Sequence, residues 1–188
     1  MLLIFLILLI SCDSNTNQQD LNCKNVSELK TIEQKNNFLS EIFDTDQALR
    51  IGVSKFDVKN AEIIDSINLS KIDCFLNSYG FPDTLNYTEK AIKAPWFVIQ
   101  HCPFLEKREN YYGILEDAHV DGEITSIQWY LYLIRNYHFK TGNMLGIEED
   151  DQLTFEQKID IIIDTLKHHE KKSKSYVKRK STNADHQS

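Results

Sequence analysis

Glycine and proline are scarce in this chain of 188 residues, with six glycines and three prolines. Sandwiches and barrels of β-strands need many turn residues, so the scarcity argues against them and favours helices. Positive charge is also in deficit, because 21 Lys and Arg residues stand against 28 Asp and Glu residues. A net charge of −7 suits no nucleic-acid partner. Twenty aromatic residues argue against global disorder, and the length suits one domain.

The familiar catalytic and cofactor motifs are missing too. The sequence contains no G-x-S-x-G, no P-loop, no H-E-x-x-H and no G-x-G-x-x-G. The signatures of the common hydrolases, nucleotide-binding proteins and metalloproteases are therefore absent. There is no C-x-x-C, and no Cys or His lies at zinc-finger spacing, so we expect neither a metal nor another cofactor.

An apolar run of ten residues opens the chain and ends at Ser11-Cys12. Such a run spans about 15 Å as a helix, half of a bilayer core, which is typical of a signal peptide and too short for a membrane span. Leu9-Ile10-Ser11-Cys12 resembles the lipobox of bacterial lipoproteins. The resemblance implies a signal peptide over 1–11, lipid on Cys12 and a lipid-anchored protein of the bacterial envelope, in a membrane and leaflet left open. The alternative is an ordinary secretory signal with an accidental cysteine.

The polar residues after Cys12 predict a flexible tether over 12–24. Three further cysteines follow, at Cys23, Cys74 and Cys102. We expect these thiols to be buried as small apolar groups, and a Cys74–Cys102 disulfide is the alternative.

Helical periodicity of apolar residues dominates from residue 25 to residue 169. It predicts an all-α fold, a compact single-domain bundle of five or six helices. The expected helices are Ser27–Arg50, Leu69–Tyr79 with Asn68 as N-cap, Thr88–Cys102, Leu105–Val120, Ser126–Lys140 and Phe155–His169. The basic segment 170–188 lacks this periodicity and is expected to be a disordered tail, or else a segment that touches anionic lipid headgroups.

Two charged residues interrupt the apolar stripe of the first expected helix. Asp46 and Arg50 fall at the centre of the stripe formed by Leu39, Ile42 and Phe43. At i, i+4 they can pair, and an unpaired charge on a buried face would be costly. The pair is either a charged pocket for a polar or anionic ligand, or an internal salt bridge that sets the register of the helix.

Gln100 and His101 stand at the end of the apolar third helix. The histidine is a candidate proton shuttle or hydrogen-bond donor, or a core residue bonded to a backbone carbonyl. His119 and Arg135 are weaker candidates on the fourth and fifth helices. We expect Asp46, Arg50 and His101 to converge, because each lies on an apolar face and needs a partner.

Short polar motifs follow one another in a characteristic order. They are Asp46-x-x-x-Arg50, Asp65-x-x-Asn68, Gly80-Phe81-Pro82, Gln100-His101 and Gly122-Glu123. In this order they resemble an uncharacterised bacterial family, a domain of unknown function with D…R, D-x-x-N, G-[WF]-P and Q-H motifs. The similarity spans Phe38 to Gly146 and implies shared polar positions, Asp65 and Asn68 among them, in a helical domain.

The chain departs from the family pattern near its end. Ile134-Arg135 stands where the family has D-R, and the segment 143–146 replaces a Q-x-Y-G run. If those positions complete an active site, this chain has lost its activity. We therefore expect an envelope lipoprotein that binds a ligand or a protein partner near Asp46, Arg50, Gln100 and His101. The alternative is an envelope enzyme, such as a hydrolase, with His101 as general base, oriented by Asp46, and with Arg50 or Arg135 holding an anionic group.

Overall fold

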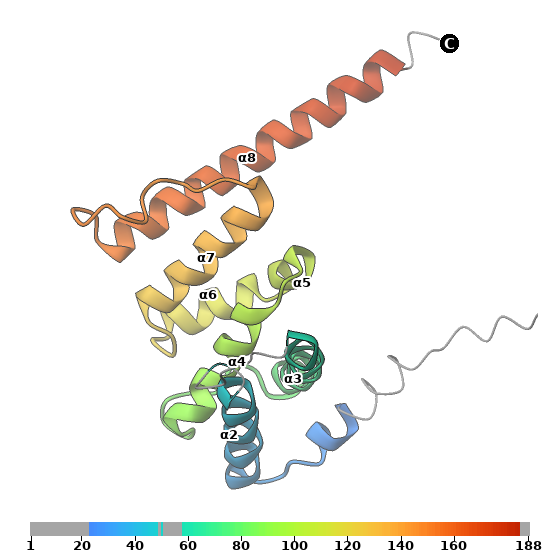
Figure 1. Cartoon of the computed structure of the whole chain (residues 1–188), viewed down its shortest axis with the longest axis vertical. Helices are drawn as coiled ribbons and strands as arrows, with labels where there is room; N and C mark the ends of the chain where they lie inside the picture. Colours follow the sequence, from blue (N-terminus) through green and yellow to red (C-terminus); the bar gives the residue numbers. More distant parts are fainter. Residues whose placement is uncertain (1–22, 49, 51–57, 185–188) are drawn as a thin grey trace, which may run out of the picture.

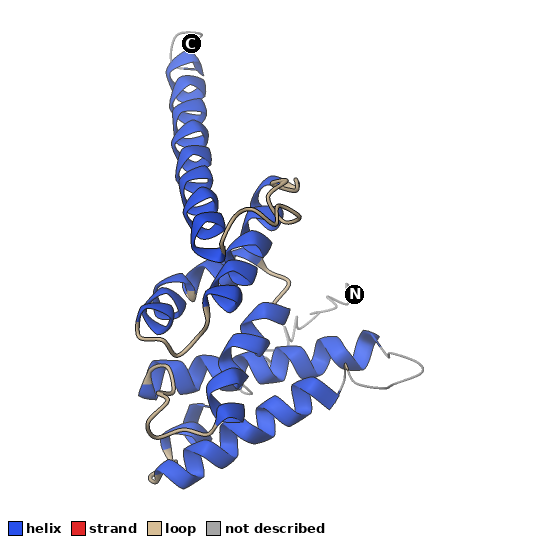
Figure 2. Cartoon of the chain, turned by 90° about the vertical axis from the view of Figure 1, so that its left-hand side faces the viewer, coloured by secondary structure: helices blue, strands red, loops and turns tan. Residues whose placement is uncertain are grey.

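Every regular element is a helix in the part of the chain that the computed structural model describes, residues 23–48, 50 and 58–184 (Figures 1 and 2). The predicted all-α fold is confirmed, although the helices of the described residues are more numerous than expected. They are a short helix over residues 23–27, α2 (Ile32–Ala48), α3 (Val58–Tyr79), α4 (Glu89–His101), α5 (Leu105–Asn110), α6 (Tyr112–Val120), α7 (Ser126–Thr141) and α8 (Phe155–Ala184). None of them is long and apolar enough to cross a membrane.

The N-terminal half of the fold is built around α4, which packs against both α2 and α3. Its apolar residues face both neighbours, so Ala91, Ala94 and Ile99 are fully buried. The side chain of Thr88 caps the start of this helix, one residue from where the sequence placed it. Pro95 lies inside α4 without ending it. Helix α4 therefore continues to His101, whose side chain lies opposite α2.

Helix α7 joins α4 to the C-terminal half of the fold. The indole nitrogen of Trp96 on α4 donates to the carbonyl oxygen of Gln128 at 3.0 Å. Trp129, Tyr132 and Leu133 of α7 are buried, and α7 also packs against α5, α6 and α8. Helix α8 lies along α7 in Figure 1, and its C-terminal part projects away from the rest of the molecule.

Two helix boundaries differ from the prediction. Helix α3 begins at Val58 rather than Leu69, so Asn68 is a buried residue inside the helix and not its N-cap. The expected fourth helix is divided at Tyr111 into α5 and α6. The carbonyl oxygen of Arg108 accepts from the hydroxyl of Tyr132 at 2.5 Å and from the backbone N–H of Tyr111 at 3.0 Å. These bonds replace the i, i+4 bond that would continue the helix.

The C-terminal segment also differs from the prediction. Helix α8 continues past His169 to Ala184, so most of the expected disordered tail is helical. A basic segment with little apolar periodicity can still continue a helix that has already started, because elongation costs less than nucleation.

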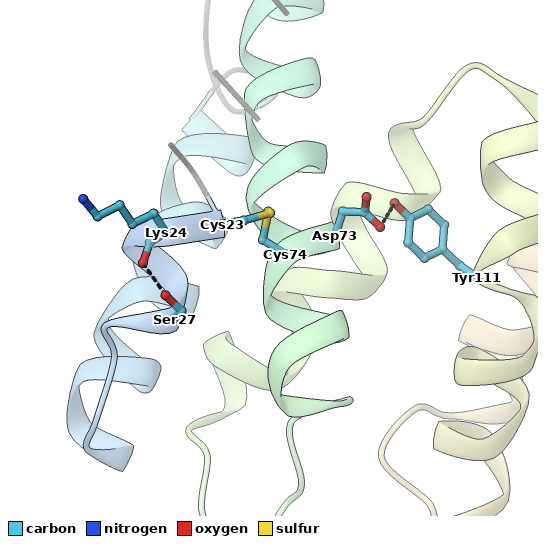
Figure 3. The surroundings of a disulfide bond; sticks show 6 residues. All are labelled: Cys23, Lys24, Ser27, Asp73, Cys74 and Tyr111. Carbon is cyan, nitrogen blue, oxygen red and sulfur yellow. Dashed lines mark hydrogen bonds between the residues drawn. A yellow bond between two sulfur atoms is a disulfide. The ribbon is translucent and has the colours of Figure 1, made fainter. Parts of the chain in front are cut away.

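The cysteine prediction is wrong for two residues. Cys23 and Cys74 form a disulfide, whereas Cys102 is free and buried as expected. The helix over residues 23–27 therefore begins within the last two residues of the expected tether. Figure 3 shows that Cys74 and its neighbour Asp73 point to opposite sides of α3. Asp73 accepts from the hydroxyl of Tyr111 at 3.2 Å, so α3 is tied on both sides.

Candidate functional site

Asp46 is the centre of a charged cluster between α2, α3 and α4. Its side chain lies on the apolar face of α2 and is only 1% exposed. One carboxylate oxygen lies 3.0 Å from the Nδ1 atom of His101 and 3.2 Å from the Nη1 atom of Arg50. The other accepts from the side-chain amide of Gln47 at 2.7 Å. The predicted convergence of Asp46, Arg50 and His101 is confirmed.

Arg50 brings a second carboxylate into the cluster. Its Nη2 atom donates to both carboxylate oxygens of Asp65 on α3, at 2.9 and 3.0 Å. Its Nη1 atom also donates to the backbone carbonyl of Asp46 at 2.5 Å. One guanidinium therefore ties the end of α2 to the middle of α3, and the charges of Arg50 and of the two carboxylates offset one another in part.

The cluster lies at the edge of the core. The side chains of Arg50, Asp65 and His101 are 22%, 23% and 21% exposed, whereas Asp46 behind them is sealed. A buried carboxylate thus holds an arginine and a histidine that both reach water. We call these four residues, Asp46, Arg50, Asp65 and His101, the Asp46 cluster.

The two ring nitrogens of His101 differ in their hydrogen bonding. A carboxylate accepts hydrogen bonds, so Nδ1 carries the hydrogen that points at Asp46. In the described part of the chain, Nε2 has no hydrogen-bond partner. The Asp46–His101 pair therefore presents Nε2 as a group that can exchange a proton or contact a ligand.

The same residues carry the donor set of a cation site. Ligand atoms of Asp46, Asp65 and His101 lie within 4.8 Å of one another. Arg50 already pairs with one oxygen of Asp46 and donates to both oxygens of Asp65, so a metal ion and the guanidinium would compete for these atoms. The expectation that this protein binds no metal stays a prediction.

Gln100 lies outside the cluster, contrary to the sequence-based expectation. Its amide nitrogen donates to the carbonyl of Leu131 on α7 at 3.2 Å, and its amide oxygen accepts from Arg108 at 3.2 Å. Consecutive residues at the end of a helix point in different directions, so Gln100 faces α7 while His101 faces α2.

Arg108 is a structural residue of this region that sequence reasoning missed. It is fully buried, and burial lowers the pKa of its guanidinium to about 10. Its partners are the carbonyls of Ile99, Gln100 and Tyr132, the side chain of Gln100, and the side-chain oxygen of Asn136. Carbonyls at the C-terminus of α4 carry partial negative charge, so a cation there fixes the end of the helix that bears His101.

The weaker candidates divide between the two halves of the fold. Asn68 lies one turn after Asp65 on α3, and its buried Nδ2 atom has no hydrogen-bond partner. His119 lies in the last turn of α6, where its ring stacks on Trp129 and its Nδ1 atom lies 3.5 Å from the carbonyl of Ile124. It is a packing residue and lies outside the Asp46 cluster.

Arg135 on α7 is partly buried, and its guanidinium lies 5.5 Å from the ring of Phe139. Burial lowers the pKa of Arg135, and the positive charge of nearby Arg50 adds to this lowering. The two guanidiniums are therefore within electrostatic range of each other.

Cys12 lies outside the described residues, so the structure carries no information about the expected lipid anchor. Comparison with known proteins found no matching family model, no matching curated protein and no matching solved structure. The resemblance to the uncharacterised bacterial family stays a prediction. Four of the positions on which it rests, Asp46, Arg50, Asp65 and His101, form the cluster described above.

Proposed function

We propose that this protein is a lipid-anchored lipoprotein of the bacterial envelope whose helical domain binds a small polar ligand or a protein partner at the Asp46 cluster. The observation that carries the proposal is the arrangement of this cluster: a sealed carboxylate holds an arginine and a histidine that both reach water. Charged groups held in place at the edge of a core are typical of binding sites. Their burial costs free energy, and a ligand that pairs with them offsets part of that cost.

The envelope location is supported by two features of the chain. The Leu9-Ile10-Ser11-Cys12 pattern resembles a lipobox. The Cys23–Cys74 disulfide suits a protein exported to an oxidising compartment, because disulfides rarely persist in the cytosol. Only ten residues separate Cys12 from Cys23. An extended chain of that length reaches about 40 Å, so the disulfide would hold the domain close to the membrane surface.

The anchor is tested with Cys12→Ser in cells labelled with radioactive palmitate. We expect the wild-type chain to carry the label and to fractionate with membranes, and the variant to lose both properties. Cys102→Ser is the matched control, since it removes a buried thiol and leaves the proposed acylation site intact. A Cys12→Ser chain that remained acylated and membrane-bound would contradict the anchor.

Ligand binding is tested by an unbiased thermal-shift screen of the full chain in detergent. A ligand of the cluster should raise the melting temperature of the wild type and not that of His101→Gln. Asp44→Asn is the matched control, because Asp44 lies on the same helix as Asp46 but is 59% exposed and pairs with Lys90 at the surface. Hits that bind His101→Gln as well as the wild type would place the ligand site elsewhere.

A second candidate function is an envelope enzyme, such as a hydrolase. The Asp46–His101 hydrogen bond favours it, because a carboxylate on Nδ1 orients the ring and leaves Nε2 to accept a proton from water. Cys102, next in the chain, is buried and its thiol donates to the carbonyl of Phe104, so water is the expected nucleophile. A panel of ester, amide and phosphoester substrates tests this function, and turnover that survives in His101→Gln would exclude His101 as the base.

A further inference from the structure

Arg135 is the one arginine without an acceptor among the three whose side chains the structure describes. Arg50 donates to two carboxylates, and Arg108 donates to several carbonyl oxygens. Arg135 contacts the ring of Phe139, and no hydrogen bond or ion pair joins its guanidinium to another described residue. A partly buried guanidinium with five unused donors is an unusual state, because the charge loses hydration without gaining a counter-charge.

Helix α7 places Arg135 beside the last turn of α4, the helix that ends at His101. The amide of Gln100 donates to the carbonyl of Leu131, one turn before Arg135 on α7. Arg108 joins the carbonyls of Ile99 and Gln100 to the side chain of Asn136, the residue after Arg135. These bonds hold the two helices together on both sides of Arg135. The effect of Arg50 on the pKa of Arg135 agrees with this placement.

Two further polar groups, one in the Asp46 cluster and one beside it, have no hydrogen-bond partner among the described residues. The first is the Nε2 atom of His101, whose other ring nitrogen, Nδ1, is hydrogen-bonded to Asp46. The buried Nδ2 atom of Asn68, one turn from Asp65, is a donor without an acceptor. The two carboxylates, in contrast, are both held by Arg50. The region therefore has unused donors on Asn68 and Arg135 and a positive charge without a counter-charge among the described residues. The protonated imidazole of His101 adds a donor at Nε2, because both ring nitrogens of an imidazolium carry hydrogen.

We propose that the ligand of the Asp46 cluster is an oxyanion, a carboxylate or phosphate group, and that Arg135 binds it together with the Nε2 atom of His101. This inference rests on the proposed function, and it adds the chemical class of the ligand. A guanidinium offers paired N–H donors that match the two oxygens of a carboxylate or phosphate. Asp46 is a positioning residue in this scheme, because it orients the imidazole and does not contact the ligand.

The inference is tested by isothermal titration calorimetry of the full chain in detergent at low chloride concentration. The probes are inorganic phosphate and three molecules of nearly the same shape: acetate, acetamide and acetamidinium, which carry negative, zero and positive charge. The variants are Arg135→Gln, Arg135→Lys and His101→Gln. Lys107→Gln is the matched control, since it removes one exposed positive charge and leaves the region intact. Circular dichroism and urea midpoints establish that each variant folds.

We expect acetate or phosphate to bind saturably and acetamide and acetamidinium to bind at least tenfold more weakly, a factor of about ten being typical for a lost charge-assisted hydrogen bond. Arg135→Gln should weaken anion binding by about the same factor, Arg135→Lys by less, and Lys107→Gln not at all. The comparison of acetate with phosphate shows whether the site prefers a planar or a tetrahedral oxyanion. Should Arg135→Gln fail to fold, the Arg135→Lys variant and the charge series on the wild type decide the matter.

Equal affinity for acetate and acetamide, or anion affinity unchanged in Arg135→Gln, would overturn the inference. If acetamide or acetamidinium binds and His101→Gln abolishes that binding, the cluster is a ligand site and only the chemical class is wrong. If no probe binds and every thermal-shift hit is independent of His101, both the inference and the proposed ligand site fail.

Discussion

Replacing Asp46 by alanine separates a structural cluster from a ligand site more clearly than any other substitution. The change removes the acceptor for the Gln47 amide, for the Nδ1 atom of His101 and for one nitrogen of Arg50. A hydrogen bond to a charged group contributes about 1.5–3 kcal/mol, and breaking a buried ion pair costs about 3–5 kcal/mol.

We expect Asp46→Ala to lower the free energy of unfolding by less than the sum of these contributions. Arg50 keeps both bonds to Asp65, and about a fifth of its side chain and of that of His101 is already in water. We therefore expect Asp46→Ala to lower the free energy of unfolding by about 2–4 kcal/mol. Urea denaturation measures this quantity. The matched substitution Asp44→Ala removes an exposed carboxylate two residues earlier and should cost less than about 1 kcal/mol.

The isosteric substitution Asp46→Asn distinguishes the two roles of the cluster. If the cluster is mainly structural, this variant loses about 1–2 kcal/mol, because the neutral amide weakens its bonds to Arg50 and His101. If the cluster is mainly a ligand site, the free energy of unfolding changes little in this variant and ligand binding is lost. An Asp46→Ala variant as stable as Asp44→Ala would refute the conclusion that the buried carboxylate holds the cluster together.

Three other outcomes can be measured on the same protein. Cys23→Ser should lower the free energy of unfolding by about 4 kcal/mol in the chain-entropy model, given the sequence separation of 51 between the paired cysteines, and dithiothreitol should then have no further effect. Arg108→Lys should destabilise the fold by about 2–3 kcal/mol in urea denaturation, because one ammonium cannot reach all the carbonyls that the guanidinium bonds; a neutral result would refute its role in fixing α4. Burial raises the pKa of Tyr132 to about 12. Because the unfolded phenol titrates near pH 10, the stabilisation by Tyr132 should be complete below about pH 10 and be lost toward pH 12, and Tyr132→Phe should show a shallower loss in urea titrations over that range.

Local sequence was sufficient to predict the all-α fold and the three residues at the centre of the site. The spacing of Leu39 and Ile42 marks one face of α2, and Asp46 falls on that face, where it is buried. A charge on such a face needs a partner wherever the other helices lie, so the convergence of Asp46, Arg50 and His101 could be inferred without knowing the topology. The start of α4, predicted within one residue, is local in the same sense, because the side chain of Thr88 caps the helix.

Helix ends were predicted less well where packing overrides propensity. Helix α3 extends eleven residues before the expected start, because Asn68 is tolerated inside a helix that is packed on both sides. The division at Tyr111 depends on the hydroxyl of Tyr132, which comes from another helix. No local pattern carries that information.

The identity of each partner was decided by tertiary structure alone. Asp65 pairs with Arg50 across 15 positions of sequence, and Cys23 pairs with Cys74 because the short N-terminal helix is placed beside α3. Nothing in the local sequence distinguishes Arg108 from a surface arginine, yet its side chain is fully buried against the end of α4. Periodicity determines which residues of a helix face inward, since that depends only on the 3.6-residue turn. Which inward faces meet depends on how the helices cross, and only the packed chain decides that.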